Sequence, residues 1–572
     1  MSINFPPALI FILGSLLIPL IPGKLRSSLV ITLAIGCIAY VANLTVGESL
    51  VYPFLNYDLI VMRVDKLSWI FGLIFSIVGL IGGVYGFHKE HAGEWVSALL
   101  YAGGALGVAF AGDFFTLLVF WELMAIASTI LIFRGSFAQS QAAGLRYLYY
   151  HLLGGSLLLG GIILHMREGN SLAMEVLTDT SSLANWLILI GVMINAAIPP
   201  LHAWLPDSYP RASITGAVFL SAFTTKSSVY ILLRLFPGWD VLIYLGVIMA
   251  LYGVVYAVLA NDIRGILAYH IISQVGYMVV GAGIGTEMAI NGASAHAFSH
   301  ILYKGVLFMG AGMVLHATAR SKLTELGGLY KSMRLTFWLY MIGAFSISGF
   351  PLFNGFISKS MVVSAAGEAG HKGIYFLLLL ASVGTFLHTG LKLPYFTWLG
   401  KANGPATTKR ALPKNMYVGI FIGGSLCVFF GLAPQVLYNW LPYNTDFRPY
   451  NLYHLVESCQ ILLFTFIAFM LLRKKLAGEN KGVVDTDFLY RRPAPAFQRV
   501  TVDSVNSFFG FAEKGFKKIV AGVATLGVNP LAYIPFSGEQ KGEFNPDVSR
   551  PPLARGICVF ILVFVALALW AF

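Results

Sequence analysis

Long apolar runs recur from one end of this 572-residue sequence to the other. Each run is about 18–25 residues long, enough for one helix to cross roughly 30 Å of hydrocarbon. Hydrophobic residues make up 57% of the chain and charged residues only 11%, whereas a soluble domain carries about 25% charged residues. The sequence therefore predicts an all-α polytopic membrane protein, in which helices satisfy their own backbone polar groups within lipid.

We expect about 14 core spans and about 2 extra spans at the C-terminal end. The expected spans lie near 4–22, 27–46, 68–87, 95–111, 113–133, 145–165, 183–204, 213–236, 240–260, 264–284, 288–318, 335–366, 373–398, 415–439, 452–473 and 553–571. The first run lacks a basic start and a small-residue cleavage site, so we interpret it as a span and not as a signal peptide.

The basic residues indicate how the chain lies in the membrane. The formal net charge of +12 comes from Lys and Arg in short loops, without the stacking aromatics that would suggest nucleic acid. Alternate loops differ about threefold in Lys and Arg, and the richer set is expected in the cytoplasm. This places both termini outside a cell (inner) membrane and the linker 474–552 in the cytoplasm.

Two other features of the sequence concern its C-terminal part and its cysteines. Residues 502–527 have helical apolar spacing with lysines on the other side, which predicts either an amphipathic helix on a membrane or partner or an ordinary surface helix.

The cysteines are widely spaced in apolar segments, so we expect core side chains that neither form disulfides nor bind metal. They are Cys37, Cys427, Cys459 and Cys558.

Two apolar segments, five spans apart, are interrupted by proline. Pro199-Pro200 lies within INAAIPPLHAWLP, and Pro351 lies within SISGFPLFNGFISKS. Such a pair is typical of an inverted repeat whose broken helices line a conduction site. The alternative is a pair of proline-kinked helices without symmetry, because proline is tolerated in membrane helices.

Several ionisable residues lie far inside the apolar runs, where they are costly and usually functional. They are Glu122, Lys226, His296, His300, Lys304 and Lys359. Three of them are four residues apart in turn and share one helix face. For His151, His165 and His316 we favour a structural role, and Lys392, which lies with His388 near a span end, is expected to reach the interface.

This set of residues favours a proton path over a sodium site. Neutral imidazole both donates and accepts protons, whereas a sodium site needs several oxygen ligands and only one mid-membrane carboxylate is apparent. No nucleotide, haem or metal motif occurs, so we expect no cofactor, no catalytic residue and no metal site. The driving force must come from an ion gradient or from partner subunits.

Five motifs together resemble one family of antiporter-like subunits. They are Trp121-Glu122, PLHAWLPDSYP at 200–210, SAFTTKSSVYILL around Lys226, NDIRGILAYHIISQVGYM at 261–278 and GFPLFNGFISK at 349–359. The family is shared by Mrp-type Na⁺/H⁺ antiporters, respiratory complex I (NADH-quinone oxidoreductase) and membrane-bound hydrogenases. The resemblance covers roughly residues 60–400.

The resemblance implies a fold with two inverted five-helix repeats. The corresponding division is 1–94 for N-terminal spans, 95–236 and 237–400 for the repeats, 401–473 for C-terminal spans, 474–552 for the linker and 553–572 for the final span. It also implies that Glu122, Lys226, His300, Lys304 and Lys359 carry protons.

One position departs from the family pattern. The family usually has a lysine five residues before the proline of the PLH motif, where this chain has Asn195. Without that partner Glu122 would hold a proton more readily, so the first half-channel either runs on altered chemistry or is only partly active.

The predicted function is proton translocation within a multisubunit membrane complex, most like the D-type subunit of an Mrp Na⁺/H⁺ antiporter. The implied partners are other integral membrane subunits, one of which could move Na⁺. The first alternative is a proton-pumping subunit of a redox complex. A remote alternative is a lipid-modifying enzyme that uses His202 and Asp207, residues for which a loop clamp is the commoner role.

Overall fold

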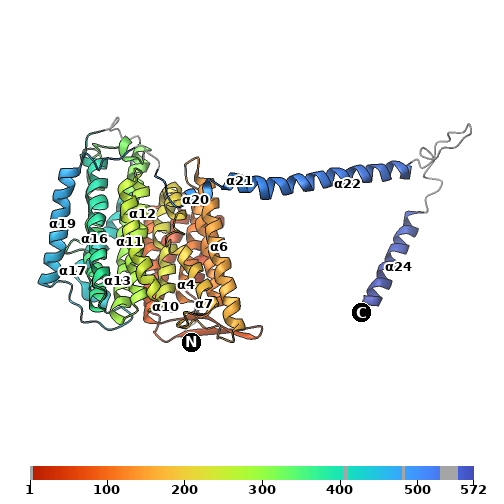
Figure 1. Ribbon diagram of the computed structural model, residues 1–572, viewed down its shortest axis with the longest axis horizontal. Helices are drawn as coiled ribbons and strands as arrows, with labels where there is room; N and C mark the ends of the chain where they lie inside the picture. Colours follow the sequence, from red (N-terminus) through yellow and green to blue (C-terminus); the bar gives the residue numbers. More distant parts are fainter. Residues whose placement is uncertain (1–3, 403–409, 480–482, 529–551, 572) are drawn as a thin grey trace, which may run out of the picture. The chain divides into compact units, whose positions relative to one another are not determined.

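The computed structural model describes residues 4–402, 410–479, 483–528 and 552–571. It divides into two units, Met1–Asp485 and Thr486–Phe572. In the first unit long helices stand side by side, as Figure 1 shows. Among the described residues, 12 helices are long and apolar enough to span a membrane, which confirms the predicted helical membrane fold.

The helices of the first unit follow the predicted spans closely. Up to the first proline break they are α1 (Ala8–Leu17), η1 (Ile18–Leu20), α2 (Leu25–Ala42), α3 (Lys66–Tyr85), α4 (Ala92–Phe110), α5 (Phe114–Phe133), α6 (Ser140–Arg167) and α7 (Leu183–Asn195). Next come α8 (Trp204–Ser208), η2 (Tyr209–Arg211), α9 (Ile214–Ala222), α10 (Thr224–Leu235), α11 (Asp240–Leu259), α12 (Ile263–Ile284), α13 (Glu287–Thr318) and η3 (Leu323–Glu325). The last are α14 (Arg334–Ser348), α15 (Asn354–Glu368), α16 (Lys372–Thr385), η4 (Phe386–Lys392), η5 (Tyr395–Leu399), α17 (Lys414–Leu432), α18 (Pro434–Tyr438) and α19 (Leu452–Leu472).

A β hairpin was not expected from the sequence. Strands β1 (Ser49–Phe54) and β2 (Tyr57–Arg63) pair antiparallel, with an irregularity between Leu50 and Val51. The hairpin lies at the end of the bundle that holds the N-terminus (Figure 1). It fills the stretch between the second and third predicted spans, for which the apolar pattern predicts no element.

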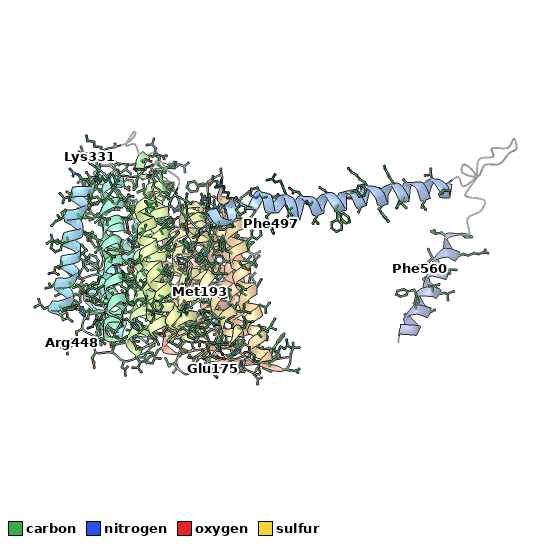
Figure 2. All side chains as sticks on the ribbon, in the orientation of Figure 1. Glu175, Met193, Lys331, Arg448, Phe497 and Phe560 are labelled. Carbon is green, nitrogen blue, oxygen red and sulfur yellow. The ribbon has the colours of Figure 1, made fainter. Side chains whose placement is uncertain are left out.

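The two ends of the bundle can be told apart by labelled side chains. Figure 2 places Lys331 at one end, Arg448 and Glu175 at the opposite end, and Met193 between them. We call the first end the Lys331 face and the second the Arg448 face. The Lys331 face carries the loops that the charge pattern predicts to be cytoplasmic.

Matching elements recur in opposite orientations in the two halves of the bundle. Asp113 caps the start of α5 by accepting a hydrogen bond from Thr116 N, and Asp262 caps the start of α12 in the same way. Each cap also forms a short bridge to the loop that follows the next helix, Asp113 to Ala173 and Asp262 to Lys322. The first bridge lies beside Glu175, on the Arg448 face, and the second beside the Lys331 loop (Figure 2), as an inverted repeat requires.

Both proline-bearing spans are broken, and so is one span that contains no proline. Residues 196–203 separate α7 from α8, and residues 349–353 separate α14 from α15. Ala197 and Leu352 have positive φ values of 59° and 75°, a strained conformation for residues other than glycine. The third break lies at Phe223, between α9 and α10.

The second unit consists of short helices and two long ones. They are α20 (Phe488–Arg491), α21 (Ala494–Gln498), η6 (Arg499–Asp503), α22 (Ser504–Val528) and α24 (Leu553–Ala571). The long α22 occupies the segment with the predicted amphipathic spacing, and its large apolar side chains are exposed within the described chain, Phe508 and Phe516 among them. Residues 529–551 of the linker lie outside the described residues.

The predicted burial of the cysteines is only half right. All four are free, but Cys459 and Cys558 are exposed while Cys37 and Cys427 are buried. Cys459 lies on α19 of the first unit and Cys558 on α24 of the second. An apolar sequence environment therefore does not by itself place a cysteine in the core.

Helices α11 and α12 pack with their backbones in close contact. A Cβ on Gly276 would lie 2.4 Å from the carbonyl oxygen of Gly246, and a Cβ on Gly253 would lie 2.5 Å from Ser273 N. Both neighbours are backbone atoms, so neither can move without shifting a helix. Glycine is required at this contact by close approach, as is common between membrane helices.

We expect Gly276→Ala to destabilise the bundle by about 1–3 kcal/mol through overpacking. Gly160→Ala in α6 is the matched control, because a Cβ there meets nothing within 4 Å. The measurement is the temperature at which half of the purified complex loses its monodisperse peak after heating. Equal temperatures for the two variants would contradict this close contact.

Candidate functional site

Three ionisable side chains line one face of α13 in the centre of the first unit. His296, His300 and Lys304 are all fully buried, and the rings of the two histidines have centroids 6.4 Å apart. His296 Nδ1 lies 3.1 Å from the hydroxyl of Ser358 on α15. The row thus reaches the broken α14–α15 span at one end.

Lys226 and Lys359 each bind the main chain at a helix break. Lys226 Nζ donates to Ser221 O at 2.6 Å, in the last turn of α9, and Lys359 Nζ donates to Ile347 O at 2.9 Å, in the last turn of α14. The last carbonyls of a helix have no partner within the helix. They carry partial negative charge, so each lysine binds where the break provides an acceptor.

The amide side of each break is also satisfied by a side chain. Thr224 N, freed at the break before α10, donates to the hydroxyl of Tyr101 at 3.0 Å. Gly355 N, freed at the break before α15, donates to the hydroxyl of Ser346 at 3.3 Å. The breaks therefore leave these backbone groups paired within the protein, as a membrane interior demands.

Two members of the central row have no hydrogen-bond partner among the described residues. Both ring nitrogens of His300 and the Nζ of Lys304 are buried and unpaired. Lys226, His296 and His270 lie within electrostatic range of His300. Buried polar groups of this kind are normally satisfied by internal water, so we expect a hydrated centre.

Glu122 and Asn195 meet at two adjacent glycines of α6. A Cβ on Gly155 would lie 1.6 Å from Glu122 Oε1, and a Cβ on Gly154 would lie 3.3 Å from Asn195 Oδ1. Asn195 is buried and its Oδ1 has no partner among the described residues. The structure thus brings the acid and the residue that departs from the family pattern to the same place, and within the described chain no cation is bonded to either.

A second carboxylate inside a span was missed by sequence reasoning. Glu457 on α19 and Lys359 line the same cavity of about 30 Å³, together with Ser382. Glu457 accepts hydrogen bonds from the hydroxyls of Tyr375 and Tyr453. Glu457 lies in the second turn of α19 and not in mid-span, so the prediction of a single mid-membrane carboxylate stays a prediction, and the position of Glu457 within an apolar run was a usable signal.

The residues His202 and Asp207 form separate clamps. Asp207 accepts hydrogen bonds from Arg146 Nε at 2.7 Å and from Arg211 Nη1 at 2.6 Å. His202 Nε2 donates to Asp485 at 3.1 Å. Each residue is thus bound to its own partners, as expected for loop clamps and not for an acid–base pair that works on a substrate.

Asp485 ties the chain after α19 to both halves of the bundle. It accepts hydrogen bonds from His202, from Tyr252 on α11 and, at 2.6 Å, from Tyr269 on α12. Burial alone raises the pKa of Asp485, but the hydrogen bonds from these three side chains hold that pKa well below its usual range. The carboxylate therefore stays charged at neutral pH, and sequence spacing gave no sign of it.

The fold and the buried row define a class, that of multi-pass, antiporter-like membrane subunits. Residues 111–388 match the family described as "NADH:quinone oxidoreductase/Mrp antiporter, TM". The D-type Na⁺/H⁺ antiporter subunit of Alkalihalophilus pseudofirmus is 33% identical over 333 residues, which are 54% of this chain and 67% of the relative. The A-type subunit of the same organism is 31% identical over 424 residues, which are 65% of this chain and 52% of the relative, so this chain spans about half of that protein.

A solved structure agrees with the fold over the whole chain. One chain of the membrane-bound sulfane sulfur reductase, described as an archaeal respiratory membrane complex, matches with a TM-score of 0.70 and 24% identity, covering 98% of this chain and 99% of its own. This chain belongs to the NADH:quinone oxidoreductase/Mrp antiporter transmembrane family. The two antiporter relatives are named as subunits, and the sulfane sulfur reductase is described as a membrane complex.

We expect Asp485→Asn to lower stability at pH 7 by about 2 kcal/mol, because it weakens charge-assisted hydrogen bonds. A carboxyl group with a depressed pKa stabilises the fold above the ordinary Asp pKa of about 3.9, and this contribution is lost as pH falls through the folded value. The deficit should stay constant between about pH 7 and 5 and shrink below about pH 4. Thermal midpoints of the purified complex test this.

The exposed Asp446→Asn serves as the control for the loss of one negative charge. Midpoints for Asp485→Asn and the wild type that coincide at pH 7 would show that the Asp485 clamp does not hold the bundle.

Proposed function

We propose that this chain, a proton-translocating antiporter-like membrane subunit, carries protons along the buried row between its two broken repeats. Protons enter near Glu122, cross by Lys226, His300 and Lys304, and leave by Lys359. The observation that carries the proposal is that Lys226 and Lys359 are each bound to the carbonyl end of a broken helix. The α13 histidines and Lys304 lie between them.

The chemistry needs only proton transfers between side chains and water. An ammonium that gives up its proton becomes a neutral amine, and a neutral imidazole accepts at one nitrogen while it donates from the other. Bound water bridges gaps longer than a hydrogen bond. His296 fits the same path, since it contacts Ser358 and lies beside His300.

The exit side of this path faces Arg448. Helix α19 begins at Leu452, close to Arg448, so Glu457 lies in its second turn, near that end. The small cavity that joins Lys359 to Glu457 supports an outlet toward the Arg448 face. We assign that face to the outside of the cell, together with both termini, and the 474–552 linker to the cytoplasm.

Sodium movement is assigned to a partner protein of the complex. The buried lysines of the row would repel a bound cation while protonated, and the two carboxylates that the proposed path includes, Glu122 and Glu457, lie at its opposite ends. We propose a D-type role in an Mrp antiporter, a choice supported by the 33% identity of the D-type relative over 67% of its length. Helix α22, whose apolar residues are exposed, would strap such a neighbour.

A redox-driven complex is the second candidate. The match to the sulfane sulfur reductase chain covers 98% of this chain and 99% of that one. In such a complex the same row would move protons with energy from partner subunits. Gentle purification followed by mass identification of the subunits separates the two candidates, because only the redox complex would contain iron–sulfur partners.

We expect Lys226→Ala or Lys359→Ala to reduce proton flux at least about tenfold while the complex still assembles, since each removes a carrier from the row. The measurement is acidification of proteoliposomes that contain the intact complex. Lys331→Ala, at an exposed lysine, is the control for loss of a positive charge. Unchanged flux in both variants would remove the proposed path.

We expect Asn195→Lys to assemble and to move the pH optimum of flux. The introduced ammonium would lie beside Glu122, next to Gly154 and Gly155, and an opposite charge at that distance favours the ionised acid. Asn195→Gln is the control for side-chain length without charge. A pH profile that matches the wild type would show that Glu122 does not depend on residue 195.

A further inference from the structure

Two histidines that the path above does not use face each other in the second repeat. His270 on α12 and His388 on η4 have ring centroids 5.8 Å apart in an edge-to-face arrangement. Both side chains are fully buried, and no hydrogen bond of normal distance and angle joins their four ring nitrogens to the described residues, although the main chain of Val254 lies near the His388 ring. Two such rings side by side are hard to explain as packing, because phenylalanine would fill the same space without buried unpaired polar atoms.

Other unpaired polar atoms belong to the same two elements. The hydroxyls of Ser273 on α12 and Thr389 on η4 are buried without a partner among the described residues, as is Lys304 Nζ. Lys304 lies within electrostatic range of both histidines. This group of donors and acceptors is suited to bound water that continues the central row sideways from Lys304.

The backbone that carries His388 is irregular. We call His270, His388 and Lys392, with the polar groups around them, the branch. The regular α16 ends at Thr385, and residues Phe386–Lys392 form a π-helical segment, η4. π-helical turns are rare and occur frequently at functional sites. This one carries three polar side chains of the branch, those of His388, Thr389 and Lys392.

Lys392 connects the branch to the Lys331 face. It is only 2% exposed, so it does not reach the interface as the sequence suggested. Its Nζ donates to Val258 O and to Ala260 O, at the end of α11. That helix end is followed directly by Asp262, which bridges to Lys322 on the Lys331 face.

We propose that His270, His388 and Lys392 form a second opening of the proton path, from the Lys331 face directly into the second repeat. A proton from water at that face enters past the end of α11 to the buried amine of Lys392, then passes through the two imidazoles to Lys304. Each imidazole takes the proton at one nitrogen and releases another from its second nitrogen, so no oxidant or other reactant is needed.

This inference rests on the proposed function but goes beyond it. The path through Glu122 uses the first repeat, where Asn195 replaces the lysine that the family pattern leads one to expect. A direct opening in the second repeat would supply Lys304 and Lys359 without passing through that altered pair. The second repeat would then reach the Lys331 face at Lys392 and the Arg448 face at Glu457.

Access to the branch can be tested without any transport measurement. In a chain whose exposed cysteines are removed by Cys459→Ser and Cys558→Ser, we would introduce Lys392→Cys or Thr389→Cys and add a membrane-impermeant thiol reagent from either side. Lys331→Cys and Arg448→Cys report the two faces (Figure 2). We expect Lys392→Cys and Thr389→Cys to react from the side that labels Lys331→Cys.

Proton flux in proteoliposomes of the intact complex then tests the role of the side chains. We expect His388→Leu and Lys392→Met each to slow flux about five- to tenfold, and the double variant to be no slower, because residues in one path are not additive. His388→Leu combined with Glu122→Gln should be slower than either alone. His316→Leu, at a half-buried histidine outside the branch, should leave flux unchanged.

The outcomes separate the inference from the proposed function. Wild-type complex without proton flux would overturn the proposed function, whereas the labelling result would still report access. Wild-type flux that persists unchanged in His388→Leu and Lys392→Met would overturn the second opening alone. Labelling of Lys392→Cys only from the Arg448 side, or from neither side, would also overturn it.

Discussion

The binding of buried lysines to the carbonyl ends of broken helices is the interaction on which the rest of this structure depends. A helix break inside a bilayer frees carbonyl and amide groups that lipid cannot satisfy. Here Lys226 binds the carbonyl end of α9 and Lys359 that of α14, while Tyr101 accepts from the freed amide before α10. The same bonds hold in the interior the two lysines that we propose as proton carriers, so one group would serve both the structure and the proposed transport.

The fold could be predicted from the sequence because its main determinants are local. Run length sets the number of spans, and the prolines mark two of the three breaks. The break at Phe223 could not be predicted, since no proline or glycine marks it and the bond that sustains it comes from Tyr101 on another helix. The hairpin at 49–63 and the π-helical η4 could not be predicted for a related reason, because short elements are set by what they pack against.

The candidate site was predictable where charge stood out against an apolar background. Glu122, Lys226, His300, Lys304 and Lys359 were chosen on that ground, and the structure buries the four basic side chains in the first unit and leaves Glu122 half-buried. Glu457 was missed although the same signal was present, and His270 was missed because a lone histidine usually has a structural role. What made His270 notable is a partner, His388, which lies on a different helix and is over a hundred residues away in the chain. Pairing across the fold cannot be seen in spacing along the sequence.

The two repeats differ in the groups that lie around their buried ionisable side chains. In the first repeat Glu122 and Asn195 meet at the Gly154–Gly155 turn, with no cation bonded to either side chain among the described residues. In the second repeat three basic side chains, Lys359, Lys304 and Lys392, are buried within one repeat, and histidines lie between them. A bound proton is therefore easier to pass on in the second repeat, where neighbouring bases compete for it. In the first repeat the proposed path contains one acid, Glu122, and one buried base, Lys226, an arrangement that suits storage or gating more than rapid transfer.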